Sequence, residues 1–178
     1  MKMQNTKKIA FLLAEGFEDS EMQNPYDEMV KNGHETVIIG LRAGQELKGK
    51  NGTVSYTTHL SIDEADPNDY AAIIIPGGSS PSKLMDNKNV QQFVQEADAS
   101  CVTIAAICHG PQVLAAAGIL EGRTLTSYPG IAGEVERAGG RFIDKKVVVD
   151  QNLITSRTPE DEPAFISETL EKIGVNAW

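Results

Sequence analysis

Two short apolar runs flank a segment of helical periodicity near the start of this chain, and this alternation limits the possible folds most. Residues 9–14 form a continuous apolar run, as expected of a strand covered on both faces. Residues 19–32 carry apolar side chains at helical spacing and end before Gly33, and residues 36–39 form a second strand. The apolar positions of the helix are Met22, Tyr26, Met29 and Val30. Strand, helix and strand in this order predict a parallel sheet with a right-handed crossover.

The rest of the chain continues the alternation. Residues 44–58 differ, because Asn51-Gly52 is a strong signal for a hairpin turn. Strands are expected over residues 71–76, 102–107, 147–150 and 153–155, and helices over 90–97, 109–117 and 163–173. The pattern predicts a three-layer α/β/α sandwich, with a mostly parallel sheet and a small antiparallel excursion. Because 178 residues suit one domain of ordinary size and no linker interrupts them, we expect a single domain over residues 1–178.

Composition and charge exclude several classes of partner. Hydrophobic residues make up 40% of the chain and charged residues 23%, which is a globular balance. No apolar run is long enough to span a bilayer, and residues 1–8 lack the apolar stretch of a signal peptide. The formal charge of −9 disfavours stable binding to a nucleic-acid backbone. A small neutral or carbonyl substrate remains compatible with these numbers.

The chain has two cysteines, Cys101 and Cys108, near opposite ends of one predicted strand. Seven residues of strand separate them by roughly 23 Å, which is too far for a disulfide. We therefore expect free thiols and a reducing compartment, which indicates a cytoplasmic protein. Cys101 has no neighbouring residues like those that follow Cys108, and it is expected to pack in the core.

Cys108 follows a buried strand and precedes a helix, within Ile107-Cys108-His109-Gly110-Pro111. This is the arrangement of a nucleophile elbow, in which a tight turn with positive φ exposes the nucleophile. The N–H groups and the dipole of the following helix are expected to depress the pKa of the thiol. Gly110 lets other backbone approach closely. The alternative is an inert, buried cysteine, as most free cysteines are.

Three other segments follow predicted strands and so share one sheet edge with Cys108. Glu15, Glu18 and Glu21 come after the first strand, and a carboxyl group beside a thiolate should have a raised pKa. The alternative is that they have no role in a site and are simply acidic residues at a helix N-terminus, where negative charge is favoured. The loop at Gly77-Gly78 could direct N–H groups at an oxyanion, or could be an ordinary turn. Tyr128, in a third loop, could line the pocket or merely pack.

These motifs, in their order and spacing from about residue 7 to 174, resemble the PfpI-like branch of the ThiJ/PfpI superfamily. The resemblance rests on Ala14–Glu21, Ile75–Gly78, Ala106–Gln112, Thr126–Gly130, Val147–Asp150 and Thr155–Pro159. It implies a flavodoxin-like fold, a Cys108 nucleophile with His109 beside it, and Glu21 as the acidic partner with Glu18 close by. It also implies oxyanion N–H groups from Gly78 and His109, no cofactor or metal, and a homodimer or higher homo-oligomer with the site near the interface.

Members of this family resemble cofactor-free glyoxalases, deglycases of glyoxal and methylglyoxal adducts, or intracellular cysteine peptidases, and several are linked to stress. The peptidases use a glutamate soon after the Pro-Gly-Gly loop, and Ser82 stands at that position here. A serine cannot orient an imidazolium as a carboxylate does. The leading hypothesis is therefore a cysteine-dependent hydrolase or lyase acting on small carbonyl compounds or on glycated proteins and nucleotides. The alternatives are a peptidase assembled across an oligomer interface, and a non-enzymatic redox sensor or holdase.

Overall fold

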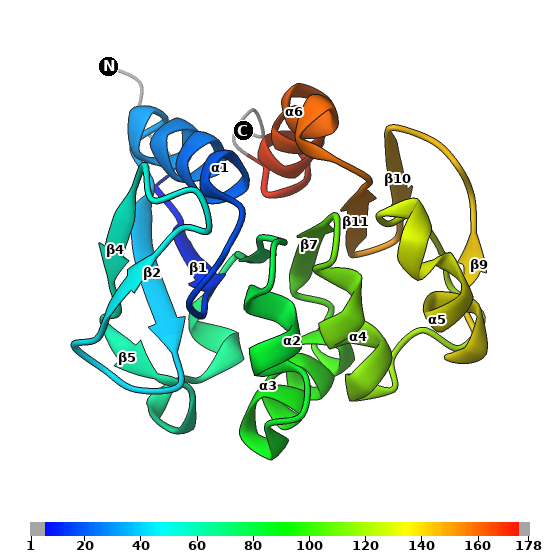
Figure 1. The fold of residues 1–178 in the computed structure, drawn as a ribbon, viewed down its shortest axis with the longest axis horizontal. Helices are drawn as coiled ribbons and strands as arrows, with labels where there is room; N and C mark the ends of the chain where they lie inside the picture. The colour runs from blue at the N-terminus through cyan, green and yellow to red at the C-terminus, as the bar shows by residue number, and fades with distance from the viewer. Residues whose placement is uncertain (1–5, 175–178) are drawn as a thin grey trace.

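A computed structural model describes residues 6–174, and its centre is a seven-stranded sheet. Its strands lie in the order β10-β11-β7-β6-β1-β2-β5 (Figure 1). All neighbours are parallel except β10 and β11, which form an antiparallel hairpin. The strands are β1 (Lys8–Leu12), β2 (Glu35–Gly40), β5 (Leu60–Ser61), β6 (Ala72–Ile75), β7 (Thr103–Ile107), β10 (Val147–Asp150) and β11 (Leu153–Ser156). The expected mostly parallel sheet is confirmed.

Helices cover both faces of this sheet and create two separate core layers. Along β1, Ile9 and Phe11 pack on one side, whereas Ala10 and Leu12 pack on the other. The first side is covered by α1 (Asp19–Lys31) and α6 (Glu162–Lys172), which lie next to each other in Figure 1. The second side is covered by α3 (Lys88–Ala99), α4 (Pro111–Ala117) and α5 (Ala132–Arg137). Because a strand with both faces covered must be apolar throughout, the continuous run over residues 9–14 is explained.

Short elements complete the structure. The expected antiparallel excursion is present as β3 (Glu46–Lys48) paired with β4 (Ser55–Thr57). A second small ladder joins β8 (Thr124–Leu125) to β9 (Arg141–Phe142) in parallel, and a five-residue helix, α2 (Ser80–Leu84), follows β6. Short 3-10 turns lie at 62–64, 67–69, 129–131 and 159–161. The sequence reasoning did not predict β5, β8, β9, α2 or α5.

Two local expectations are wrong. The helix expected from residue 109 begins at Pro111, because residues 108–110 form the turn that leaves β7. Cys101, expected in the core, is exposed and lies outside β7 with a φ of 60°. Its N–H donates to Asp98 O at 3.0 Å in the turn that ends α3. This backbone hydrogen bond, rather than packing of the thiol, explains the position of Cys101.

The strand order places a topological switch beside β1. The chain runs from β1 outward to β2 and β5, and then returns to β6 on the other side of β1. In open parallel sheets a crevice forms outside the carboxyl ends of the strands at such a switch. The segments after β1, β6 and β7 are therefore brought to one place, and they contain Glu18 and Glu21, Gly77 and Gly78, and Cys108.

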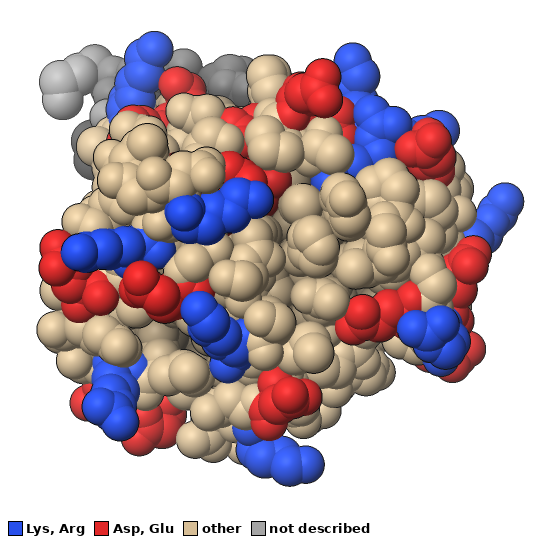
Figure 2. Space-filling view, viewed as in Figure 1, with Lys and Arg blue, Asp and Glu red and all other residues tan. Residues whose placement is uncertain are grey.

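Three further observations concern surface charge, the hydropathy of the helices and possible metal ligands. In the view of Figure 2, basic and acidic side chains are interspersed over the visible face, and neither sign forms a continuous patch. Within residues 6–174, no helix has the length and apolar character needed to cross a bilayer. The same residues contain no group of three or more His, Cys, Asp or Glu side chains arranged to hold a metal ion. Residues 1–5, part of the segment where no signal peptide was expected, lie outside the described residues.

Candidate active site

Cys108 occupies a sharp turn between β7 and α4. Its φ is 64°, which confirms the left-handed conformation expected of an elbow. Backbone hydrogen bonds fix the turn on both sides: Cys108 N donates to Ser156 O at 3.0 Å, and Tyr128 N donates to Cys108 O at 2.9 Å. Gly110 closes it, since its N–H donates to Ile107 O at 2.8 Å. The residue is only 8% exposed, so the turn directs the thiol to a hollow in the surface rather than to open solvent.

Glu21 lies in the first turn of α1 and is completely buried. Its Oε1 accepts a hydrogen bond from Gly77 N at 2.8 Å, and its Oε2 has no hydrogen-bond partner among the described residues. Burial raises the pKa of this carboxyl group from 4.5 to about 8, the Gly77 N–H opposes the rise, and the charge of Glu18 adds to it. Glu21 is therefore mostly protonated at neutral pH and can donate a hydrogen bond from Oε2.

Gly77 separates Glu21 from Cys108 and must be a glycine. A Cβ at this position would lie 2.6 Å from Glu21 Oε1 and 2.9 Å from Cys108 Cβ. Gly78, with a φ of 78°, and His109 both present backbone N–H groups to the sulfur. The Pro-Gly-Gly loop thus holds the carboxyl group and the thiol close together. Its Gly78 N–H lies with the N–H of His109 beside the sulfur, where two donors could stabilise an oxyanion.

The thiol itself differs from expectation. Burial, followed by the negative charge of Glu21, raises the pKa of Cys108 from 9.0 to about 12, and the N–H groups of His109 and Gly78 only partly oppose this rise. The expected depressed pKa is thus contradicted, because the helix N-terminus is outweighed by desolvation and by a neighbouring acid. At neutral pH the protonated Glu21 carries no charge, so its repulsion of a thiolate is largely absent there.

His109 supplies a base next to the thiol. Its Nδ1 lies 3.4 Å from Cys108 Sγ. Burial, and then the positive charge of Lys50, lowers the pKa of the imidazole below 6.5, so the ring is neutral at pH 7 and can accept a proton. The ring is stacked on Tyr128, with centroids 4.7 Å apart and planes inclined by 23°. Tyr128 therefore lines the site and holds the imidazole beside the sulfur.

The hollow outside the thiol has a volume of about 560 Å³, enough for a small organic molecule. Glu18 and Lys50 form an ion pair on its wall, with Nζ and Oε1 2.8 Å apart. Ser82, also on the wall, donates its hydroxyl to Ser79 O at 2.6 Å. Glu15 lies elsewhere, since its Oε1 accepts from Lys48 N on β3. The lining residues are Glu18, Lys50, Gly78, Ser79, Ser82, Cys108, His109, Gln112, Tyr128, Thr158 and Pro159.

Sequence reasoning missed several of these lining residues. Ser79, Thr158 and Pro159 lie in or beside motifs that follow β6 and β11, so the sheet-edge rule could have found them. Gln112 faces α5, where it donates to Glu134 Oε1 at 3.1 Å. Lys50 comes from the β3–β4 hairpin, which no sheet-edge argument connects with Cys108. The only indication of Lys50 in the sequence is that it is a basic residue in a predicted hairpin turn.

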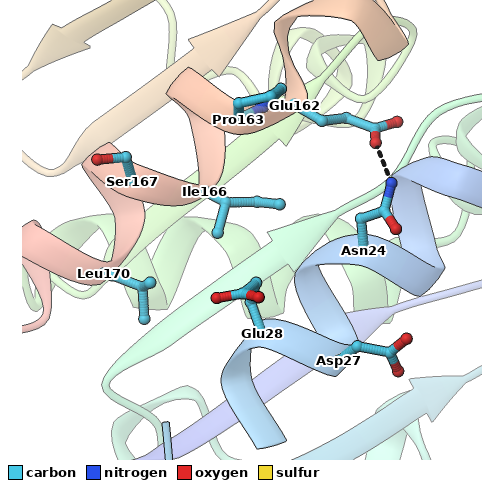
Figure 3. A pocket seen from close by; sticks show the side chains of 8 residues that line it. All are labelled: Asn24, Asp27, Glu28, Glu162, Pro163, Ile166, Ser167 and Leu170. Atoms are coloured by element: carbon cyan, nitrogen blue, oxygen red, sulfur yellow. Dashed lines mark hydrogen bonds between the residues drawn. The ribbon is translucent and has the colours of Figure 1, made fainter. Parts of the chain in front are cut away.

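A second hollow, of about 640 Å³, lies between α1 and α6, and its lining residues include no cysteine or histidine (Figure 3). Glu162 is buried there and accepts hydrogen bonds from Ser20 Oγ and Asn24 Nδ2, both at 2.6 Å. Ile166 and Leu170 point from α6 into the space between the helices. This arrangement fastens the two helices together, and nothing in it resembles the chemistry around Cys108.

A family model and the sequences of curated relatives match this chain, and the matches agree with one another. A model of the DJ-1/PfpI family matches residues 7–172. Protein/nucleic acid deglycase 2 of Escherichia coli (strain K12) is 45% identical over 170 residues, which cover 95% of this chain and 99% of the relative. General stress protein 18 of Bacillus subtilis (strain 168) is 44% identical over 165 residues, which cover 92% and 96%.

Solved structures agree. A two-domain protein of Anabaena variabilis, with DJ-1/ThiJ/PfpI-like and ferritin-like domains, matches with a TM-score of 0.93 and 38% identity over 94% of this chain. The chain spans 48% of that longer protein. DJ-1beta of Drosophila melanogaster matches with a TM-score of 0.87 and 28% identity, over 94% of this chain and 90% of the relative. The fold is thus the flavodoxin-like fold of these proteins.

Proposed function

This chain belongs to the DJ-1/PfpI family, and we propose that it is a cysteine-dependent enzyme that removes glyoxal and methylglyoxal, or their early adducts on proteins and nucleotides, without a cofactor. The observation that carries the proposal is the pairing of Cys108 with a buried, protonated Glu21 across Gly77. The name of the Escherichia coli relative as a deglycase supports the reaction class, and the name of the Bacillus subtilis relative supports a role in stress.

The first step of the proposed reaction joins sulfur to the aldehyde carbon. His109 Nδ1, 3.4 Å from Sγ, accepts the thiol proton as sulfur attacks the carbon. The carbonyl π electrons move to oxygen, which the N–H groups of Gly78 and His109 stabilise and which takes a proton from Glu21. The product is a hemithioacetal bound to Cys108, and Glu21 is left as a carboxylate.

The second step moves a proton between neighbouring carbons. The Glu21 carboxylate removes the proton from the carbon that bears sulfur, while the neighbouring carbonyl oxygen takes the proton held by His109, which gives an enediol. Glu21 then gives its proton to the adjacent carbon, and His109 takes back the proton of the hydroxyl group on the carbon that bears sulfur. This converts the hemithioacetal of methylglyoxal into a lactate thioester, in which one carbon is oxidised and the other reduced. Water then attacks the thioester carbon and gives one proton to Glu21, and the sulfur leaves with the proton held by His109. Lactate is released and the thiol, His109 and Glu21 return to their starting protonation, so no external oxidant or reductant is consumed.

The peptidase alternative lacks a carboxylate for His109. Among residues 6–174, no carboxylate hydrogen-bonds to the ring, and Ser82 directs its hydroxyl to Ser79 O. An acid from another subunit would have to supply the missing group. We also propose a cytoplasmic location, because both cysteines are free thiols, and a homo-oligomer of at least two chains.

The test is a parallel assay of methylglyoxal consumption, lactate release and peptide hydrolysis. Cys101→Ser is the matched control, since Cys101 is exposed and does not line the hollow. We expect the wild type and Cys101→Ser to form lactate from methylglyoxal, and Cys108→Ser to form none. Release of free amine from a pre-formed adduct, measured with free methylglyoxal trapped, separates a deglycase from a glyoxalase. Peptide cleavage without dicarbonyl turnover would establish the peptidase instead, and neither activity would leave the redox sensor.

A further inference from the structure

Lys50 brings a positive charge from the β3–β4 hairpin to the site. It follows β3 in the turn of the β3–β4 hairpin, which lies beside α1 (Figure 1), and its side chain lines the same hollow as Cys108. Its ammonium group acts electrostatically on Cys108, Glu21 and His109, which places it within range of the reacting atoms. No step of the proposed reaction uses this charge.

Hydrogen bonds hold the backbone of the turn that carries Lys50. Lys50 N donates to Phe17 O at 2.8 Å. The Asp19 carboxylate, which is buried, accepts from Asn51 N at 2.9 Å, Thr53 N at 2.9 Å and Thr53 Oγ1 at 2.8 Å. Gly49 permits this packing, because a Cβ there would lie 2.3 Å from the Asp19 carboxyl group. Asp19 is therefore a positioning residue for the turn that carries Lys50.

The ion pair with Glu18 is unequal in exposure. The Lys50 side chain is 49% exposed, whereas the Glu18 side chain is only 16% exposed. An entering molecule therefore meets the cation before the carboxylate. An ammonium group has three N–H donors, and the hydrogen bond to Glu18 uses one and raises the pKa of Lys50, so the charge persists at neutral and moderately alkaline pH.

We propose that Lys50 forms an anion subsite that favours substrates carrying a carboxylate or phosphate near the reactive carbonyl carbon. As a substrate preference this rests on the proposed function, but the subsite can be tested without turnover. Adducts on nucleotides, or on amino acids with a free carboxylate, have the required group, and methylglyoxal itself lacks it. The charge assists binding of the ground state and the transition state alike, so it acts on KM more than on kcat.

The first test measures alkylation of Cys108 by anionic iodoacetate and by neutral iodoacetamide. Both reagents form a bond from sulfur to a CH₂ carbon and release iodide, so a change in thiol pKa affects both rates and cancels in their ratio. We expect Lys50→Met to lower the iodoacetate to iodoacetamide ratio at least about threefold at low salt, and added salt to narrow the difference. Lys48→Met, a change on an exposed lysine of β3 outside the hollow, should keep the wild-type ratio.

The second test uses substrate pairs that differ in one charged group. For phosphate, the pair is the methylglyoxal adducts of guanosine monophosphate and guanosine. For carboxylate, it is the methylglyoxal hemithioacetals of N-acetylcysteine and its amide. In at least one of these pairs, Lys50→Met should raise the KM of the charged member at least about threefold more than the KM of the neutral member. The effect on kcat should be smaller.

The outcomes separate the two proposals. A ratio of alkylation rates that is unchanged in Lys50→Met overturns the anion subsite, whether or not the wild type consumes dicarbonyls. A reduced ratio in a protein without dicarbonyl turnover supports the subsite and removes the proposed function. Equal KM changes for charged and neutral members of both pairs overturn the substrate preference.

Discussion

The buried carboxyl group of Glu21 makes the stability of the folded chain depend on pH. Its pKa is about 8 in the folded chain and 4.5 in the unfolded chain, so the folded state binds more protons between these values. Unfolding free energy should therefore fall as pH rises from about 5 to 8. Over the whole range between the two pKa values, the loss of unfolding free energy is roughly 5 kcal/mol, because Glu21 ionises there in the unfolded chain but stays protonated in the folded one. The measurement is urea unfolding at a series of pH values.

Glu21→Gln isolates this contribution, because glutamine keeps the acceptor for Gly77 N but does not titrate. The wild type should lose more stability than this variant between pH 5 and 8. The comparison is needed because His34 and His109 have lowered pKa values and contribute with the opposite sign. Equal pH slopes in the two proteins would mean that Glu21 is ionised in the folded state at neutral pH.

The same variant tests the proton transfer at the reacting carbons. Glu21→Gln retains a hydrogen-bond donor but cannot act as a base, so dicarbonyl turnover should fall by a factor of about 10² or more. Cys108 should still react with iodoacetamide. Glu18→Gln should reduce turnover less, because the Glu18 carboxylate pairs with Lys50, whereas the Glu21 carboxyl group binds the loop beside the thiol. The opposite order of effects would assign the proton transfer to Glu18.

At the scale of residues, the sequence could indicate which groups meet but not their protonation. The elbow at Cys108 was predictable from a buried strand followed by Gly110 and Pro111, and its positive φ is confirmed. The pKa of its thiol was not predictable. The result depends on desolvation by packed neighbours and on Glu21, which is distant in sequence, and these outweigh the local helix N-terminus.

At the scale of elements, Asp19 should control the order of the β3–β4 hairpin. Its carboxylate holds the N–H groups of Asn51 and Thr53, and these hydrogen bonds lower its pKa although burial alone would raise it. Asp19→Ala leaves these donors without their acceptor, at a cost of about 1–3 kcal/mol for each one that stays buried. Amide exchange at residues 49–54 should then accelerate at least about tenfold.

Hydrogen exchange with mass spectrometry measures this effect by peptide. Asp27→Ala is the control, since Asp27 is exposed on the same helix. In that variant the exchange at residues 49–54 should match the wild type. If Asp19→Ala left this exchange unchanged while the protein remained folded, the hairpin would be held by its own ladder rather than by the carboxylate.

Element length explains which parts of the fold were predictable. The helix expected over 19–32 is found at Asp19–Lys31, because its thirteen residues show the apolar period over several turns. The two-residue strands β8 and β9 and the six-residue helix α5 contain too few positions to show a period. These elements are fixed by long-range contacts, such as the hydrogen bond that Thr124 N of β8 donates to Asp150 Oδ2 at 2.8 Å.

At the scale of the whole molecule, the order of strands creates the site. Glu21, Gly77 and Cys108 are far apart in sequence, yet they follow β1, β6 and β7, which are neighbours at the switch point. A sequence-based argument from strand ends could therefore place them together. Lys50 reaches the same hollow from outside the main sheet, which is why only the structure connects it with Cys108.

The surface area bears on association between chains. The structure exposes 8187 Å², close to the roughly 8400 Å² that a folded monomer of 19.2 kDa typically exposes. Each chain thus closes its own core, and the homo-oligomer implied by the family resemblance would add a contact rather than complete a core. Association and folding should consequently be separable in this protein.

Dissociation of the oligomer should therefore change turnover without unfolding the chain. Light scattering at micromolar concentration should give the mass of at least a dimer. On dilution below the dissociation constant, the circular dichroism of the chain should stay native, because the core belongs to one protomer. Turnover per chain should fall on the same dilution, since the resemblance places the site near the interface. A monomer at micromolar concentration would contradict the oligomer, and turnover unaffected by dissociation would mean that the residues around Cys108 form a complete site within one chain.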